Sequence, residues 1–490
     1  ALGVAAALAL WAIAAWLARV PWPLAGARGF EPGRLDAALS SPPAGFVLAL
    51  GAAAALALLF GLRRGRASTA AAQAMSTRIG YAGLVVATGL GWLLLFDLSA
   101  GGHFGNRYLA LYHQGHLWLG LMLFSVLLFL RQPLARALGW SLSIAAEGAA
   151  RVAQRLGRVW AAAALLLLTG AAVLLFGLGL AHMRQLTSEL GRVWLIVGAA
   201  WFFFLRAAPL AERLARSGAA GISFWRYLWP LFFVVGVLIA AMLVTHDMGP
   251  LLIAAYGSGA FVAASVAAWW HQRSGRRVSA FVLALVLFAG WIGAATATLF
   301  KLGAVDSVTA TRLESLAAPF ASTNDQLALV SWFQRAAPPE GFGIGAAPWC
   351  GYAAAGCSGV PAQIHSDYTV TAMVGVFGAT AAWAASLGCA LWLHRLIRHH
   401  GRVTRGEPRF IASAQRYAND GQALLSWIGV AWVALTLCQL AVTVAGNVAV
   451  LPLTGVTFPF VSFGMTSLVL DLAFLALCIN VDVPGRGRDG

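Results

Sequence analysis

A histidine and an aspartate, His365 and Asp367, stand two positions apart immediately before a long apolar segment. A carboxylate in such a place can accept a proton from a substrate hydroxyl, and a neighbouring imidazole can orient the carboxylate or the substrate. Aspartate is also favoured as the residue that caps a helix, and this simpler role would explain Asp367 as well. The pair therefore predicts either an acid–base site or a capped helix start.

Two further polar groups lie at the edges of apolar segments, where an ionisable side chain is costly and is a functional hypothesis by default. Glu189 and Arg192 are three residues apart, so they share a helical face. They would either neutralise each other or shape a polar cavity that holds a phosphate or a catalytic group. Asp247 precedes Gly249 and Pro250, a pattern that suits either a helix start or a functional turn.

The segment 452–467 contains two prolines, two glycines and several hydroxyl side chains where hydropathy predicts membrane. In hydrocarbon every backbone N–H and C=O needs an internal partner, so a broken helix is tolerated only against protein or a water-filled cavity. The composition of this segment therefore predicts a re-entrant or cavity-lining turn, not a plain membrane span.

The elements that would position these residues are membrane helices. Of the 490 residues, 60% are hydrophobic and 10% are charged, whereas about 25% are charged in a soluble domain. Apolar runs of about 20 residues predict membrane helices. Twelve such runs lie near residues 1–20, 45–62, 79–97, 113–130, 159–180, 193–210, 227–245, 250–270, 278–300, 369–394, 424–450 and 456–481.

The basic residues follow the predicted topology. Of 33 Lys and Arg residues, 24 lie in alternate loops and at the C-terminal end, and six lie in the intervening loops. The positive-inside rule then places both termini in the cytoplasm and the loop 302–368 outside. The net charge of +16 is thus explained by topology. Nucleic-acid binding is the weaker interpretation, because no basic cluster is interleaved with a soluble aromatic fold.

The outer loop 302–368 is the largest extramembrane piece, and a loop of this length is usually functional. It contains a glycine-rich turn at 341–345 and two cysteines, Cys350 and Cys357. An oxidising compartment would allow these two to form a disulfide, and two free thiols are the alternative. The other cysteines fall in predicted helices, where burial is the default; they are Cys389, Cys438 and Cys478.

Taken in order, four motifs resemble the SEDS family (shape, elongation, division and sporulation), and the chain looks like a divergent relative of FtsW, RodA and SpoVE. The motifs are Ser188-Glu189 with Arg192, Asp247-Met248-Gly249, His365-Ser366-Asp367-Tyr368, and a closing stretch from Leu451-Pro452 through Gly455 to Pro459-Phe460-Val461-Ser462-Phe463-Gly464, with Gln439 upstream of it. The resemblance implies an all-α polytopic membrane protein. It has a ten-helix core over 79–481, two extra N-terminal helices within 1–62, and the long outer loop between its ninth and tenth helices.

The resemblance also implies a peptidoglycan glycosyltransferase, which transfers a growing lipid-linked glycan onto the 4-hydroxyl of lipid II and releases undecaprenyl pyrophosphate. The family's catalytic aspartate maps onto Asp367, which would be the base. The residues that would line the cavity or bind substrate are Glu189, Arg192, Asp247, Lys301, Arg312, His365, Pro452, Gly455, Pro459, Ser462 and Gly464.

Partners follow from the same resemblance. Lipid II, a glycan on undecaprenyl pyrophosphate and membrane lipids are the expected ligands, a class B penicillin-binding protein is the expected protein partner, and nucleic acid is not expected. The expected location is the bacterial cytoplasmic membrane. No metal site is assigned and no cofactor is firmly implied, although a divalent cation stays open.

The chain also departs from the family pattern. Residues 373–378 stand where members have paired glutamates, and Arg192 replaces a lysine, which keeps the charge but changes its geometry. Three alternatives therefore stay open: a membrane scaffold without catalysis, a flippase for lipid-linked sugars, and a membrane glycosyltransferase with another acceptor, such as a glycan ligase.

Overall fold

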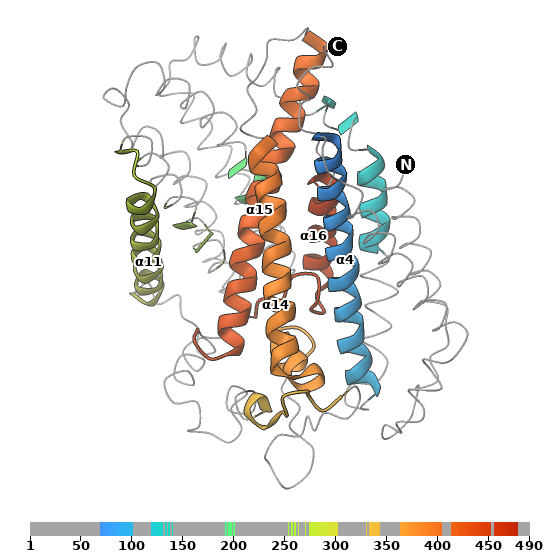
Figure 1. Ribbon diagram of the computed structural model, residues 1–490, viewed down its shortest axis with the longest axis vertical. Helices are drawn as coiled ribbons and strands as arrows, with labels where there is room; N and C mark the ends of the chain where they lie inside the picture. The colour runs from blue at the N-terminus through green and yellow to red at the C-terminus, as the bar shows by residue number, and fades with distance from the viewer. Residues whose placement is uncertain are drawn as a thin grey trace, which may run out of the picture. The chain divides into compact units, whose positions relative to one another are not determined.

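The computed structural model describes five long helices and some of the turns beside them (Figure 1). The described residues are 69–100, 119–130, 133–134, 136–137, 140, 192–193, 195–197, 199–200, 253, 256–257, 259–260, 263, 270, 274–301, 330, 333–343, 363–403, 413–451 and 455–478. Every regular element among them is a helix. The all-helical prediction is confirmed for this part of the chain, and the number of helices stays a prediction.

The chain divides into two compact units. The first comprises Ala1–Arg131, Arg312–His399 and Gln439–Gly490, and the second comprises Gln132–Thr311 and His400–Cys438. All the contacts around Asp367 described below lie within the first unit.

The first unit contains α4 (Thr69–Ala100), most of α14 (Thr369–Val403), the last turns of α15 (Ser413–Asn447) and α16 (Met465–Cys478), which Figure 1 draws in blue, orange and red. A shorter apolar helix, Leu119–Leu130, is also described in this unit. Two apolar stretches, Thr369–Ile397 and Leu424–Asn447, are long and apolar enough to cross a membrane. Length and composition therefore fit α14 and α15 to a bilayer.

Glycines on α4 let its neighbours approach closely. A Cβ added to Gly83 would collide with the ring of Trp392 on α14, and one added to Gly91 would collide with the carbonyl oxygen of Val461. Small residues at such contacts allow close packing between membrane helices. Because of Gly91, α4 lies directly against the irregular segment that precedes α16.

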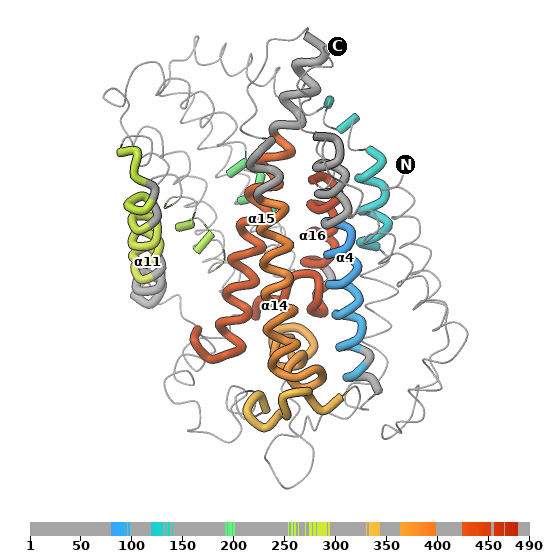
Figure 2. The backbone as a smooth tube through the Cα atoms, viewed as in Figure 1, coloured from blue at the N-terminus to red at the C-terminus, as the bar shows by residue number. Residues whose placement is uncertain are grey.

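Helix α14 is broken at Gly378, which has φ 85° and ψ 164°, a conformation that is essentially restricted to glycine. The backbone of residues 342 and 343 fills the break. Phe342 N–H donates to the carbonyl of Gly375 at 2.7 Å, and Gly343 N–H donates to the carbonyl of Val376 at 3.1 Å. Figure 2 traces the backbone through this part of α14. The loop thus compensates for hydrogen bonds that the break removes from the helix.

The closing segment differs from the predicted helix 456–481. The helix α16 begins only at Met465, and residues 455–464 are irregular. Averaged hydropathy does not mark the start of α16, because the irregular residues before it are themselves largely apolar. The break that the prolines and glycines predicted is therefore present in the described part of 452–467.

The end of α14 and the start of α15 also differ from prediction. The predicted helices 369–394 and 424–450 leave a loop over 395–423, yet α14 continues to Val403 and α15 begins at Ser413. Hydropathy marks only the apolar part of a helix that continues into polar residues. Cys389 and Cys478 are buried as predicted, whereas Cys438 is only half-buried.

The second unit contains α11 (Arg277–Lys301) and described parts of other segments. Gly259 lies against the ring of Trp291 on α11, and Gly257 lies against Leu435 on α15. Close packing at glycines thus recurs in this unit.

Candidate functional site

A tight turn over 363–368 presents the motif of His365 and Asp367. The carbonyl oxygen of Gln363 accepts hydrogen bonds from the N–H groups of Ser366 (3.0 Å), Asp367 (2.9 Å) and Tyr368 (3.3 Å). Gln363 itself has φ 66°, a left-handed conformation that costs a non-glycine residue roughly 1–2 kcal/mol. Strain of this kind is held in place by surrounding structure and often occurs at functional sites.

Ser462 ties this turn to the irregular segment before α16. Its hydroxyl donates to the carbonyl of Ser366 at 2.7 Å and accepts from the N–H of Phe458 at 2.7 Å, and it also contacts the hydroxyl of Thr369. Because its proton already has an acceptor, Ser462 acts here as a structural link between two segments far apart in the sequence.

The segment 455–464 is held by two further contacts. Phe463 N–H donates to the carbonyl of His365 at 3.0 Å, and the two rings meet edge to face with their centroids 5.5 Å apart. Phe460 has φ 62°, and its buried ring packs on Trp392 at a centroid distance of 5.2 Å. Packing on Trp392 offsets the strain at Phe460, so the segment is a fixed wall beside the turn.

Asp367 lies where the turn and this wall meet. Its side chain is only 4% exposed. Gly455 is exposed and has φ 72°, and a Cβ placed on it would lie 3.6 Å from Oδ2 of Asp367. The carboxylate is therefore covered at this point by a residue that has no side chain.

The helix-cap hypothesis for Asp367 can be weighed at the first turn of α14. The N–H of Thr371, one of the amides that an N-terminal cap would satisfy, donates instead to Oδ1 of Asn447 at 3.2 Å. An amide from α15 thus performs this part of the capping. The Asp367 carboxylate is not required for it.

Asn447 and Gln334 belong to the site's surroundings, and the sequence analysis missed both. The side-chain amide of Asn447 donates to the backbone carbonyl of Asp367 at 2.8 Å. Gln334 Nε2 donates to the hydroxyl of Thr371 at 2.7 Å and to the carbonyl of Asn447 at 2.8 Å. A signal was present, because Asn447 follows Gln439 by eight residues in the apolar stretch Leu424–Asn447.

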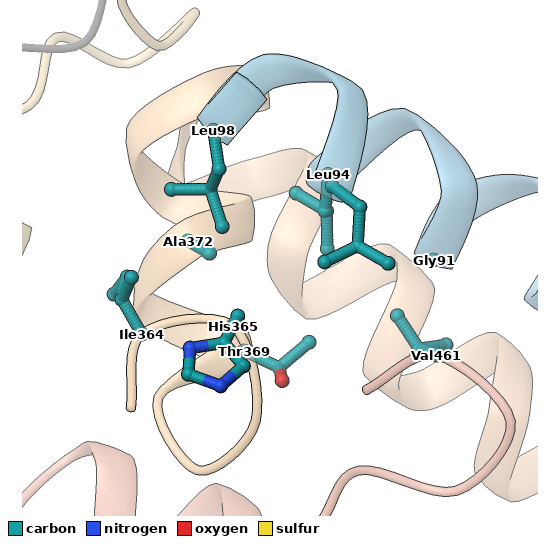
Figure 3. Close-up of a pocket in the computed structure, with 9 residues that line it drawn as sticks. Gly91, Leu94, Leu98, Ile364, His365, Thr369, Ala372 and Val461 are labelled. Atoms are coloured by element: carbon teal, nitrogen blue, oxygen red, sulfur yellow. The ribbon is translucent and has the colours of Figure 1, made fainter. Parts of the chain in front are cut away.

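His365 lies beside a small cavity (Figure 3), whose other lining residues include Leu94, Leu98, Ile364 and Thr369. The cavity is about large enough for a single water molecule. Burial lowers the pKa of the His365 imidazole below its usual 6.5, since desolvation disfavours the charged form. His365 is therefore neutral at pH 7 and does not supply a cation for a pyrophosphate.

Other residues predicted for the site are not brought together by these contacts. Arg192 belongs to the second unit, is 7% exposed, and donates to the hydroxyl of Thr436 at 3.3 Å. Lys301 ends α11 in that unit. Outside the described residues lie Glu189, Asp247, Arg312, Cys350, Cys357 and Pro452, together with the two predicted helices within 1–62.

The remaining predicted residues of the wall, Pro459 and Gly464, are packed within it. Pro459 is buried, and Gly464 is so close to Thr457 that an added Cβ would lie 3.1 Å from its methyl group. Within the described part of the chain, no three His, Cys, Asp or Glu side chains gather in a way that could hold a metal ion.

Part of the chain matches a known protein family. Residues 410–486 match the model of the cell cycle protein family of FtsW, RodA and SpoVE. This part of the chain is similar to the SEDS family. The predicted resemblance is thus confirmed, and the SEDS match covers α15, the wall 455–464 and α16, whereas the turn 363–368 lies outside it.

Solved structures add a weaker likeness. A chain from a structure described as the structural coordination of polymerization and crosslinking by a peptidoglycan synthase complex is 18% identical and has a TM-score of 0.48. The similarity covers 82% of this chain and 96% of that chain. At that TM-score no residue role transfers between the two. Curated protein sequences give no match.

Proposed function

We propose that this protein is a multi-pass SEDS member of the bacterial cytoplasmic membrane that acts in cell-wall synthesis. Its activity would be that of a peptidoglycan glycosyltransferase, which polymerises lipid II into glycan strands for division or shape. A class B penicillin-binding protein would crosslink the strands as its partner. The two extra N-terminal helices would lie outside the ten-helix core.

One observation supports this proposal above the others, the position of the Asp367 carboxylate. It is nearly buried, it lies in a turn held by hydrogen bonds from two other segments, and Gly455 lies beside its Oδ2. Positioned carboxylates are effective general bases. The glycine leaves room beside the oxygen that a larger side chain would fill.

The chemistry would be an inverting transfer. Asp367 takes the proton of the 4-hydroxyl of lipid II while that oxygen forms a bond to the anomeric carbon at the end of the growing glycan. The bond from this carbon to the undecaprenyl pyrophosphate breaks, and the pyrophosphate leaves with the bonding electrons. Cationic groups would stabilise the charge that develops on it.

The remaining roles rest on the family resemblance and on charge. Glu189 with Arg192 would organise the cavity, Asp247 would lie at its edge, and Lys301 and Arg312 would meet phosphates. Arg192 is always charged and can hold an oxyanion with two parallel hydrogen bonds. His365, being neutral, would orient Asp367 or the acceptor.

One observation favours a function without catalysis. Where the family has paired glutamates, Met373, Val374 and Val376 are buried and apolar, so no second carboxylate lies in this turn of α14. A scaffold for a penicillin-binding protein, or a flippase for lipid-linked sugars, would not need one.

Purified protein incubated with lipid II distinguishes these functions. The polymerase proposal expects glycan strands, in greater amount when the transpeptidase partner is added. A flippase would move lipid II across vesicle membranes and leave it unpolymerised. A scaffold would bind the partner and do neither, and either of these results would replace the proposed function.

A further inference from the structure

Three buried polar residues form a stripe on the last turns of α15. Gln439, Thr443 and Asn447 are each four residues apart, and each is 1–2% exposed. That spacing places all three on one face of a helix. Polar side chains are unexpected in this apolar environment, because burying them without partners is costly.

Each member of the stripe bonds one of the two segments that form the site. Gln439 Nε2 donates to the carbonyl of Thr457 at 2.8 Å. The Thr443 hydroxyl lies 2.9 Å from the carbonyl of Gln439 in its own helix and shares its proton with the carbonyl of Val456 at 3.2 Å. Val456 and Thr457 both belong to the wall 455–464. The stripe therefore fixes the wall through its backbone.

Asn447, the third member, bonds the turn. Its amide nitrogen donates to the carbonyl of Asp367 at 2.8 Å and to the carbonyl of Thr443 at 2.9 Å. Its oxygen accepts from the N–H and from the hydroxyl of Thr371, both at 3.2 Å. One side chain thus holds both ends of the short stretch that carries the carboxylate.

The outer loop completes the network. Gln334 Nε2 bonds the hydroxyl of Thr371 and the backbone carbonyl of Asn447. The same loop fills the break of α14 a few residues further along. Both the start of α14 and the end of α15 are therefore held by one loop segment, 334–343.

We infer that Asn447 is a positioning residue for the glycosyl transfer, which sets the Asp367 carboxylate against the wall through the backbone of the turn. The inference rests on the proposed function for the reaction itself. Asn447 does not contact the reacting atoms in this role. Its contribution is the placement of the base, and a displacement of about 1 Å at a catalytic group can cost on the order of 100-fold in rate.

The test uses the full chain in lipid nanodiscs and compares Asn447→Ala with Ser386→Ala. Ser386 is a matched control because it is buried on α14 and its hydroxyl bonds only within that helix, to the carbonyl of Ala382. We expect Asn447→Ala to lower kcat for lipid II polymerisation about 10- to 100-fold while KM changes less than about threefold. Ser386→Ala should keep wild-type values.

Hydrogen exchange supplies a readout that needs no substrate. The amides of 366–372 should exchange about tenfold faster in Asn447→Ala than in Ser386→Ala, because the Thr371 amide loses its acceptor. Equal exchange and equal kcat in these two variants would overturn the inference. Absence of polymerisation by the wild-type protein would instead refute the proposed function, and the exchange comparison would still decide the position of the turn.

A second pair of variants serves if Asn447→Ala does not fold. Thr371→Val removes a hydroxyl that bonds both Asn447 and Gln334, with little change in volume, and Thr371→Ser keeps it. We expect kcat to fall about 3- to 10-fold in the valine variant and to recover in the serine variant. Equal kcat in the two variants would count against the network.

Discussion

At the residue scale, His365 supplies no positive charge beside Asp367 at pH 7. The adjacent imidazole of His365 lies against a cavity with mostly apolar lining and against Phe463, and burial lowers the pKa of this imidazole. A neutral His365 can orient a hydroxyl or accept its hydrogen bond. Charge for the leaving pyrophosphate must therefore come from other residues, for which Arg192, Lys301 and Arg312 are the proposed cations.

This state of His365 predicts how stability depends on pH. The unfolded imidazole titrates near 6.5 and the folded one at lower pH, so below pH 6.5 the unfolded chain binds more protons. Stability should consequently fall as the pH drops from 7 to 5. Replacing the imidazole should abolish the share of this stability loss that comes from His365.

Melting temperatures of wild type and His365→Gln, measured in detergent at pH 7 and pH 5, test the prediction. The melting temperature of the wild type should fall more between pH 7 and pH 5 than that of the variant. A wild-type loss no larger than the variant's would show that the imidazole is not buried in the folded protein.

At the scale of elements, the irregular segments shape the candidate site more directly than the helices do. Prolines and glycines in the sequence predicted that 452–467 would break, and the described part of it does. The same reasoning missed the break at Gly378, since an isolated glycine in an apolar helix carries no local sign of a kink. The break depends on contacts with 338–343, which are distant in the sequence.

The residues of the candidate site likewise divide into those that the sequence indicates and those that only the tertiary structure shows. The order of motifs identified Asp367 and the wall residues as candidates, because each motif is contiguous in the sequence. Asn447 and Gln334 act through tertiary hydrogen bonds, and spacing alone does not show which carbonyl an amide will bond. A polar stripe on an apolar helix is the one local sign, and for this chain it would have indicated Asn447.

The break in α14 predicts different outcomes for two glycines on one helix. Gly378→Ala should destabilise the protein by about 1–3 kcal/mol, because its φ of 85° disfavours a side chain and a Cβ would collide with the carbonyl of Pro339. Gly388 has nothing within 4 Å of its Cβ position. Gly388→Ala should therefore be neutral or stabilising by up to about 1 kcal/mol.

Thermal unfolding of the two variants in the same detergent provides the comparison. A Gly378→Ala variant as stable as Gly388→Ala would mean that α14 is a continuous helix in the membrane.

At the scale of the whole molecule, the distribution of charge predicts the orientation. With 24 of 33 basic residues in alternate loops and the C-terminal end, the loop 302–368 should face outward and the C-terminus inward. The test uses a chain whose five cysteines are replaced by serine. Ser307→Cys in the outer loop should react with a membrane-impermeant maleimide in intact spheroplasts. Gly490→Cys should react only after the membrane is opened, and the opposite pattern would invert the topology.

The central claim is that Asp367 is the base of a lipid II polymerase. The most direct measurement is polymerisation of lipid II by purified Asp367→Asn, a substitution that keeps the shape of the side chain and removes its basicity. We predict a loss of at least about 100-fold, the range typical of a general base, with the melting temperature and lipid II binding close to those of the wild type. Full polymerisation by a folded Asp367→Asn protein would contradict the account.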